Sequence, residues 1–159
     1  MTRSSTTNVG RPLETIAVTV DVHVFVARQA VRRCAEAVGF GRIECQELLI
    51  ATSELASNIL KYGIRGEIIV EPLMDKARGA GIRIVARDVG PQFHDLETAL
   101  MDGHGDRGPV DPTLLLKRGG LGSGLGAVVR FTDSFQCEEQ PVGKRITVVR
   151  YVRRGSVRN

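Results

Sequence analysis

The chain has 159 residues, 42% hydrophobic and 25% charged, which is enough to bury the core of one soluble domain without cross-links. Aromatic residues make up only 4% and tryptophan is absent, which argues against a base-stacking platform for single-stranded nucleic acid. A net charge of +4 is a small excess, so DNA or membrane binding is a weak alternative, and an acidic ligand or partner fits it equally well.

The cysteines and the chain ends carry few signals. Cys34, Cys45 and Cys137 are odd in number and lack metal-ligand spacing, and we expect the two within predicted helices, Cys34 and Cys45, to be small buried apolar side chains. The polar residues 1–12 are expected to be disordered and contain no apolar signal region, and no apolar run approaches a membrane span. We therefore expect a cytoplasmic protein, with a basic tail at 153–159.

Apolar periodicity and turn residues divide the chain into helices and strands. In chain order they predict a strand at 13–20, helices at 21–38 and 43–62, strands at 66–73 and 81–88, a short helix at 95–101, a long lid at 102–118, a helix at 125–132 and strands at 134–138 and 145–152. This order predicts one α+β domain in which helices pack on one face of a mainly antiparallel sheet.

The two long helices have recognisable ends and stripes. The first is expected to begin with Asp21 as its N-cap and to end at Gly39. The residues that repeat at helical spacing in it are Val22, Phe25, Val26, Gln29, Ala30 and Arg33. The stripe of the second helix that we expect to face the core consists of Leu48, Thr52, Leu55, Ala56, Ile59 and Leu60.

Two polar residues, Glu54 and Asn58, interrupt the apolar second helix. Their spacing places a carboxylate and a carboxamide on one helical face, one turn apart. The Asn58 carbonyl oxygen suits a hard cation that keeps several waters and bridges phosphates. Glu54 could accept a proton from an attacking hydroxyl or water. In isolation, such a pair is also typical of a solvated helix face.

Two glycine-bearing segments follow this helix, at 88–91 and 119–126. Asp88 ends an apolar strand, where its carboxylate can accept a hydrogen bond from the exocyclic amine of adenine, and Gly90 allows close approach of the base. The second segment precedes a helix, so its backbone N–H groups form an anion site suited to phosphates. An ordinary turn and a flexible loop are the alternatives.

The run 122–127 also imitates a dinucleotide fingerprint, which makes a dinucleotide-binding oxidoreductase an alternative function. No strand directly precedes the run and no βαβ unit surrounds it, which argues against that function. The order of helix pair, strand-end aspartate, lid and glycine loop instead matches the order that an ATP site needs.

Three motifs, Ser53–Asn58, Asp88–Pro91 and Gly120–Gly126, resemble the N-box and the two glycine boxes of the GHKL ATPases. With the segment 27–41, they resemble more narrowly the small serine/threonine-protein kinases that act as anti-sigma or switch proteins, the RsbT type of bacterial stress signalling. The resemblance covers residues 13–152. It implies a two-layer α/β sandwich of the Bergerat, or histidine kinase-like ATPase, type.

Carried over by position, the resemblance implies a role for each motif. Glu54 would be the general base, Asn58 the Mg²⁺ ligand and Asp88 the residue that reads adenine. The glycines that would shape the pocket and the phosphate loop are Gly90, Gly120, Gly122, Gly124 and Gly126. Arg118 matches a basic lid position and would stabilise charge on the γ-phosphate, with a solvated loop cation as the alternative.

The chain departs from the family pattern at two places. Gln92 stands where the first glycine box has its last glycine. If that position needs a positive φ, a side chain there costs about 1 kcal/mol. The lid at 102–118 is longer than in the RsbT type and looks more like the anti-sigma version.

The function implied by the resemblance is ATP- and Mg²⁺-dependent phosphorylation of a STAS-domain antagonist protein in a bacterial partner-switching, or anti-sigma, module. The alternative is a non-catalytic, ATP-gated binding module that sequesters a sigma factor or activates a PP2C-type phosphatase. The resemblance leaves room for a homodimer. We expect no membrane partner and no direct contact with nucleic acid.

Overall fold

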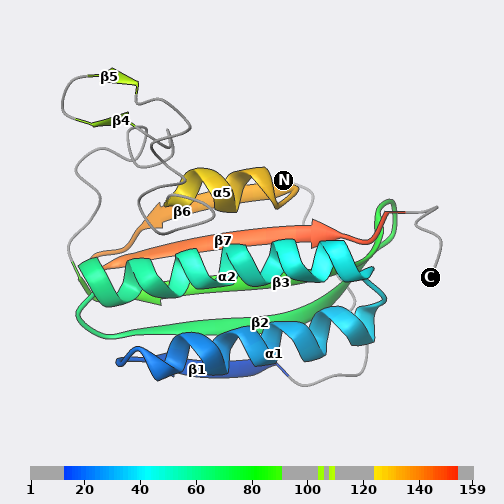
Figure 1. The fold of residues 1–159 in the computed structure, drawn as a ribbon, viewed down its shortest axis with the longest axis horizontal. Helices are drawn as coiled ribbons and strands as arrows, with labels where there is room; N and C mark the ends of the chain where they lie inside the picture. The colour runs from blue at the N-terminus through cyan, green and yellow to red at the C-terminus, as the bar shows by residue number, and fades with distance from the viewer. Residues whose placement is uncertain (1–12, 91–103, 106–107, 110–123, 154–159) are drawn as a thin grey trace.

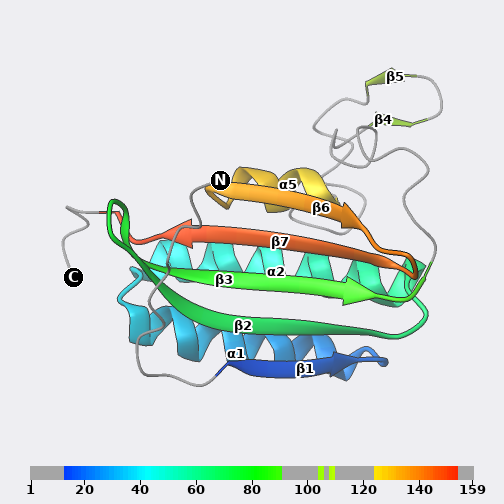
Figure 2. The same ribbon diagram turned by 180° about the vertical axis from the view of Figure 1, so that it is seen from behind.

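The computed structural model describes residues 13–90, 104–105, 108–109 and 124–153. Within these residues, a five-stranded sheet carries three helices on one face (Figures 1 and 2). The helix predicted at 95–101 and most of the predicted lid lie outside the described part of the chain.

Every pair of neighbouring strands in this sheet is antiparallel. The spatial order is β1 (Glu14–Val18), β2 (Gly66–Asp75), β3 (Gly79–Asp88), β7 (Lys144–Tyr151) and β6 (Ser134–Glu139). β3 and β7 are therefore neighbours although β6 lies between them in the sequence (Figure 2). Their pairing places Asp88 opposite Lys144 at one end of the sheet.

The three helices, α1 (Val22–Val38), α2 (Arg42–Tyr62) and α5 (Leu125–Arg130), lie on the same side of the sheet (Figures 1 and 2). This arrangement confirms the predicted α+β class. β4 (His104–Gly105) and β5 (Gly108–Pro109) form a short antiparallel pair. The lid at 102–118 is predicted as a loop without secondary structure, and for these four residues that prediction is wrong. Among the described residues, no helix is long and apolar enough to cross a membrane.

The core lies between the helices and the sheet, where the stripes of period 3.6 and period 2 meet. The strand residues in this core are Ile16, Val18, Ile68, Val70, Ile82, Ile84, Ala86, Ile146 and Val148. Those of α2 are Cys45, Leu48, Leu49, Ala51, Thr52, Leu55, Ala56 and Ile59. The predicted α2 stripe is confirmed: five of its six residues are buried, and the half-buried Leu60 packs against the same core. The hydroxyl of Thr52 is tolerated in this core because it donates a 2.7 Å hydrogen bond to the Leu48 carbonyl oxygen.

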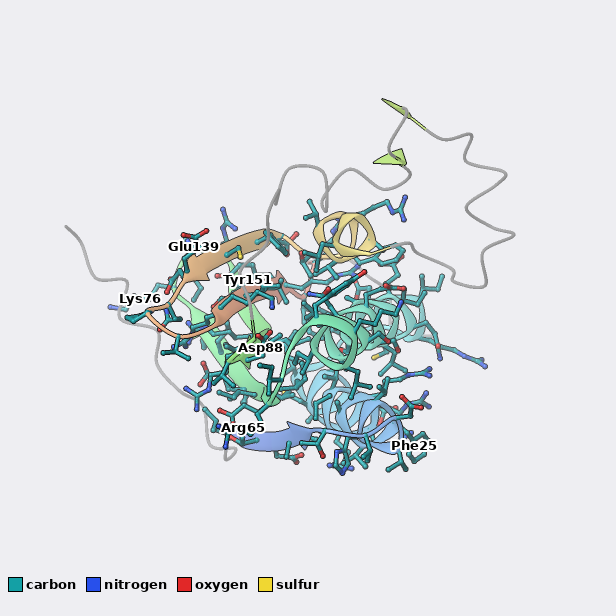
Figure 3. The ribbon with its side chains drawn as sticks, turned by 90° about the vertical axis from the view of Figure 1, so that its left-hand side faces the viewer. Phe25, Arg65, Lys76, Asp88, Glu139 and Tyr151 are labelled. Atoms are coloured by element: carbon teal, nitrogen blue, oxygen red, sulfur yellow. The ribbon has the colours of Figure 1, made fainter. Side chains whose placement is uncertain are left out.

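α1 buries a different face from the one its large apolar residues indicate. Its buried residues are Ala27, Ala30, Val31, Cys34 and Ala35. Val22 and Phe25, from which the period is taken, are 61% and 59% exposed. Figure 3 shows Phe25 on the outer side of the helix layer. Small residues allow a closer approach between packed helices, so packing against the sheet and α2 selects the alanine face.

Both ends of α1 lie where the sequence predicts them. Gly39 has φ 110°, and its N–H closes the last turn on the Ala35 carbonyl oxygen at 3.1 Å, as expected of a C-terminal glycine. Asp21 precedes the helix, but its side chain makes no capping hydrogen bond. Its backbone carbonyl oxygen instead accepts the Val24 N–H at 3.1 Å. Asp21 is therefore the N-cap residue, as predicted, but it caps the helix through its backbone and not through its side chain.

The hairpin between β2 and β3 is longer than predicted because pairing continues to Asp75 and Gly79. A tight turn closes it, in which the Asp75 carboxylate accepts the N–H groups of Ala77 and Arg78 at 2.8 Å each. These two backbone hydrogen bonds lower the pKa of Asp75. The polar segment that predicts the turn is thus partly strand.

The two cysteines within helices are buried, as the sequence predicts. Cys34 and Cys45 are buried within α1 and α2, and Cys137 is half-buried on β6. Removal from water raises the pKa of Cys45 and of Cys137, because burial disfavours the thiolate. Both are therefore packing residues with little nucleophilic character at neutral pH.

Candidate functional site

α2 carries Glu54 and Asn58 one turn apart on one face, and both side chains are half-buried. The helix is fixed at both ends. The Gly41 N–H donates to Glu44 Oε2 at 3.0 Å at the first turn. At the last turn, the Gly63 N–H makes a 2.7 Å backbone hydrogen bond. The two polar side chains therefore project from a rigid element, which suits residues that must hold a defined geometry.

The glycine run predicted to bind phosphates reaches α2 at Glu54. The N–H of Gly124, immediately before α5, donates a hydrogen bond to Glu54 Oε2 at 3.1 Å. Gly124 has φ 70°, which glycine adopts without steric cost. The buried Leu125 and Val128 of α5 anchor this end of the run in the core. Two segments 70 residues apart in sequence therefore meet at the Glu54 carboxylate.

Asp88 ends β3 on the helix-facing side of the sheet, between the strand layer and the helix layer (Figure 3). Because side chains alternate along a strand, it shares this face with the buried Ile84 and Ala86. Asp88 is only 7% exposed. The end of α2 lies against it, since a Cβ on Gly63 would be 2.9 Å from Asp88 Cγ. The carboxylate is thus held beneath the end of the helix that carries Asn58.

Lys144, the first residue of β7, is a charged member of this site that the sequence analysis missed. Its Nζ lies 3.0 Å from both Asp88 Oδ1 and Oδ2. The two side chains are 2% and 3% exposed, so the ion pair is buried. Asp88 Oδ1 also accepts the Gly90 N–H at 2.8 Å. One signal could have found Lys144: it occupies the inward position of a strand in which Ile146 and Val148 alternate inward.

Gly143 fixes the position of Lys144 against Asp88. It has φ 85°, and a Cβ there would be 1.7 Å from the Asp88 carbonyl oxygen and 2.7 Å from Val89 Cα. The turn before β7 therefore passes over the end of β3 at a distance that only glycine permits. This close approach brings the base of the Lys144 side chain to the buried carboxylate.

We expect Gly143→Ala to lower the free energy of unfolding by about 2 kcal/mol more than Gly79→Ala. Both glycines have φ 85°, so both variants incur the same left-handed backbone cost. A Cβ on Gly79 meets no atom within 4 Å, whereas one on Gly143 meets the Asp88 backbone. Urea unfolding followed by circular dichroism gives the difference, and equal losses in the two variants would contradict the close approach.

Contacts within the protein itself explain why residue 90 is a glycine. A Cβ there would be 2.5 Å from the Tyr62 carbonyl oxygen and 2.7 Å from Gly63 Cα. The segment that leaves β3 therefore packs directly on the end of α2. The sequence analysis gives another reason, the close approach of adenine. This packing does not test that role.

The remaining predicted site residues are distributed unevenly. Gly126 lies within α5 and is half-buried. Arg118, Gly120 and Gly122 lie outside the described residues, and so does Gln92. In the part of the chain that is described, the end of the glycine run is in contact with the helix carrying the acid and the amide, and the aspartate lies beneath that helix.

A cavity of about 410 Å³ opens beside Asp88 and Lys144 at the same end of the sheet. Its other charged lining residues are Arg65, Glu67, Arg87 and Arg145. None of the lining residues comes from α2 or α5, so the cavity contains neither Glu54 nor Asn58. We therefore place the candidate site on the helix-facing side of the sheet, and the cavity borders it from the sheet end.

The donor set fits a magnesium ion held mainly by phosphates and water. Among the described residues, no three His, Cys, Asp or Glu side chains cluster as a metal site. Mg²⁺ does not need such a cluster, because it keeps several waters and takes few protein ligands beside phosphate oxygens. Asn58 and Glu54 offer an amide and a carboxylate oxygen one turn apart on α2, and Glu54 also accepts the Gly124 N–H, so an ion would find oxygen ligands beside the end of the glycine run.

Comparisons with known proteins identify the family of the chain. Residues 16–150 match the family of histidine kinase-like ATPase domains, a range that includes Glu54, Asn58 and Asp88. The chain is 32% identical over 131 residues to the serine/threonine-protein kinase RsbT of Bacillus subtilis (strain 168), which covers 82% of this chain and 90% of that relative. The chain therefore belongs to the histidine kinase-like ATPase family and is an RsbT-like member of the GHKL ATPases.

Proposed function

We propose that the chain is an ATP-dependent protein serine/threonine kinase. The observation that carries this proposal is the hydrogen bond from Gly124 to Glu54, because it brings the end of the glycine run to the helix that holds Glu54 and Asn58. Asp88 lies beneath the end of the same helix. The residues proposed to contact adenine, the metal ion and the phosphates therefore share one side of the sheet. The identity to a serine/threonine-protein kinase supports the same reaction class.

Each residue has one task in this proposal. Asp88 accepts a hydrogen bond from the exocyclic amine of adenine, and Asn58 holds Mg²⁺ through its amide oxygen. Bound Mg²⁺ would neutralise charge on the transferred phosphate. Glu54 takes the proton of the attacking serine or threonine hydroxyl, while backbone N–H groups of the glycine run, with Arg118 before it, stabilise phosphate charge.

The proposed protein substrate is a STAS-domain antagonist in a bacterial partner-switching module. This substrate class rests on the likeness to the RsbT type, and the 32% identity over most of both chains supports it. A sigma factor and a PP2C-type phosphatase are the further partners that such a module would supply. Phosphorylation of the antagonist would then set which partner the chain binds.

The experiment that tests the nucleotide site is a calorimetric titration with ATP and Mg²⁺, with NADH as the control ligand. We expect ATP binding to need Mg²⁺ and to weaken about tenfold or more in Asn58→Ala, because the variant lacks the amide oxygen for the ion. Gln46→Ala, at an exposed position of the same helix, should bind like the parent protein. Unchanged ATP affinity in Asn58→Ala, or binding of NADH alone, would reject the site.

A second candidate function is an ATP-gated binding module that regulates a partner without phosphorylating it. The buried Lys144–Asp88 ion pair favours this candidate, because Lys144 occupies the carboxylate that adenine is proposed to contact. Weak nucleotide binding combined with strong partner binding would be the expected behaviour. A Glu54→Ala variant separates the two functions: partner regulation survives the loss of phosphotransfer only in the binding module.

A further inference from the structure

One row of charged side chains crosses the face of the sheet that points away from the helices. Strand pairing places Glu67 of β2 opposite Arg87 of β3, and Arg87 opposite Arg145 of β7. Side chains alternate between the two faces along a strand, so this row and the adjacent Asp88–Lys144 pair lie on opposite faces. The row is therefore separate from the proposed nucleotide site.

Arg87 and Arg145 are like charges at directly opposed positions of this row, which destabilises a sheet. Arg87 is compensated, because its guanidinium pairs with the Glu67 carboxylate. Arg145 is half-buried and makes no ion pair within the described part of the chain. Glu138 of β6 lies opposite it on the other side, but this residue is exposed and forms no ion pair with it. The positive charge of Arg145 therefore has no carboxylate partner among the described residues.

The guanidinium-bearing Arg145 belongs to the lining of the cavity of about 410 Å³ at this end of the sheet. Arg65, which directly precedes β2, is a second arginine of the lining that makes no ion pair with any described residue. The turn before β7 adds Gln140 and Val142 to the lining. Figure 3 looks onto this end of the molecule, where Arg65 and Asp88 are labelled. The two arginines therefore border one recess at the end of the sheet.

The charge balance of this cavity is positive. Its lining contains four cationic and two anionic side chains, which leaves a surplus of two positive charges. The anionic groups are already paired, Glu67 with Arg87 and Asp88 with Lys144. A recess lined by a surplus of one sign of charge attracts ions of the opposite sign. The cavity therefore favours an anion that neutralises the two remaining arginines.

We propose that this cavity binds a small phosphate-type dianion through Arg145 and Arg65. A guanidinium group stays protonated in proteins, and its planar fork donates two parallel hydrogen bonds to a phosphate. A monocarboxylate has two oxygens and occupies one such fork, whereas a phosphate monoester has three terminal oxygens and two negative charges, which match two arginines. The volume is that of a small-molecule pocket. Inorganic phosphate and a small phosphate monoester share this chemistry.

Binding of the dianion also explains why two arginines can lie opposite each other in the sheet. An anion at Arg145 offsets its repulsion with Arg87, as Glu67 already does from the other side. A ligand that binds only the folded protein raises its melting temperature. Phosphate should therefore raise the melting temperature of the parent protein, and the rise should depend on Arg145.

The test is a calorimetric titration with inorganic phosphate, glycerol 3-phosphate and acetate in about 0.15 M salt, which screens weak surface attraction. We expect Arg145→Gln to weaken phosphate binding about tenfold or more, and Arg65→Gln about threefold or more. Arg145→Lys keeps the charge but loses the planar fork, so its affinity should fall between those of the parent and Arg145→Gln. Arg42→Gln removes an exposed arginine at the start of α2, and this control should bind phosphate like the parent.

Thermal unfolding with and without phosphate is the second measurement, and phosphate should raise the melting temperature of the parent but not of Arg145→Gln. Unchanged phosphate affinity in Arg145→Gln, an equal loss in Arg42→Gln, or acetate binding as tight as phosphate binding would overturn the proposal. Absence of phosphate binding to the parent at about 10 mM would overturn it as well. If Arg145→Gln does not fold, the same comparisons on Arg65→Gln decide.

The two phosphate probes identify the source of the ligand. Tighter binding of glycerol 3-phosphate than of inorganic phosphate supports a phosphorylated small molecule, and equal or weaker binding supports inorganic phosphate. The result is independent of the proposed kinase activity, because the site lies on the other face of the sheet. Loss of ATP binding in Asn58→Ala with phosphate binding intact would support both sites, whereas a parent protein that binds phosphate but not ATP would reject the proposed function alone.

Discussion

Glu54→Gln is expected to bind ATP within about threefold of the parent protein and to transfer phosphate about 10²- to 10⁴-fold more slowly. Glutamine keeps an oxygen that can accept the Gly124 N–H, so the contact between α2 and the glycine run survives. It cannot take a proton from the attacking hydroxyl. The loss should therefore fall on the chemical step and leave nucleotide binding intact.

The measurement is transfer of radiolabelled γ-phosphate to purified STAS-domain proteins from the same genome, with ATP affinity determined on the same preparations. Glu36→Gln is the matched control, because it neutralises an exposed carboxylate on α1. This control should transfer phosphate at the parent rate. Parent-like transfer by Glu54→Gln would remove the general base from the proposed mechanism and leave the binding module as the better description.

The sequence predicts the layers of the fold well, because each sheet strand has a regular pattern and each helix end has a glycine or turn signal. It fails on the buried face of α1. Phe25, the bulkiest apolar residue there, and Val22 are exposed, whereas Ala27 and Val31, which lie outside the predicted period, are buried. Periodicity identifies a helix but not which of two adjacent stripes is inside, since close packing of neighbouring elements makes that choice.

In the candidate site, too, the sequence predicts some features and misses others. The i,i+4 spacing of Glu54 and Asn58 and the strand-end position of Asp88 follow from local pattern, and each lies on the predicted element. Lys144 was missed because its partner is 56 residues away, and only the β3–β7 pairing brings them together. The contact between Gly124 and Glu54 likewise depends on how α5 packs on α2. Residue pattern thus predicts which groups are present, whereas sheet order determines which groups meet.

Asp88→Asn is expected to lower the free energy of unfolding by about 3–5 kcal/mol, because it leaves the Lys144 ammonium buried without its carboxylate. The asparagine oxygen can still accept the Gly90 N–H, so the loss comes mainly from the charge. Denaturant unfolding followed by circular dichroism measures it. Glu71→Gln is the control on the same sheet: Glu71 pairs with Arg83 at 2.5 Å, but the side chains are 18% and 33% exposed, so about 1 kcal/mol or less is expected.

The double variant Asp88→Asn with Lys144→Met separates charge burial from packing. Removing both charges should recover much of the stability lost in Asp88→Asn, because neither group is then buried alone.

ATP affinity in folded Asp88→Asn should fall by about 1–3 kcal/mol as well, since adenine loses a charged acceptor. A stability loss below 1 kcal/mol in Asp88→Asn, with no recovery in the double variant, would show that the pair contributes little to the fold. A stable Asp88→Asn protein with parent ATP affinity would place the base elsewhere.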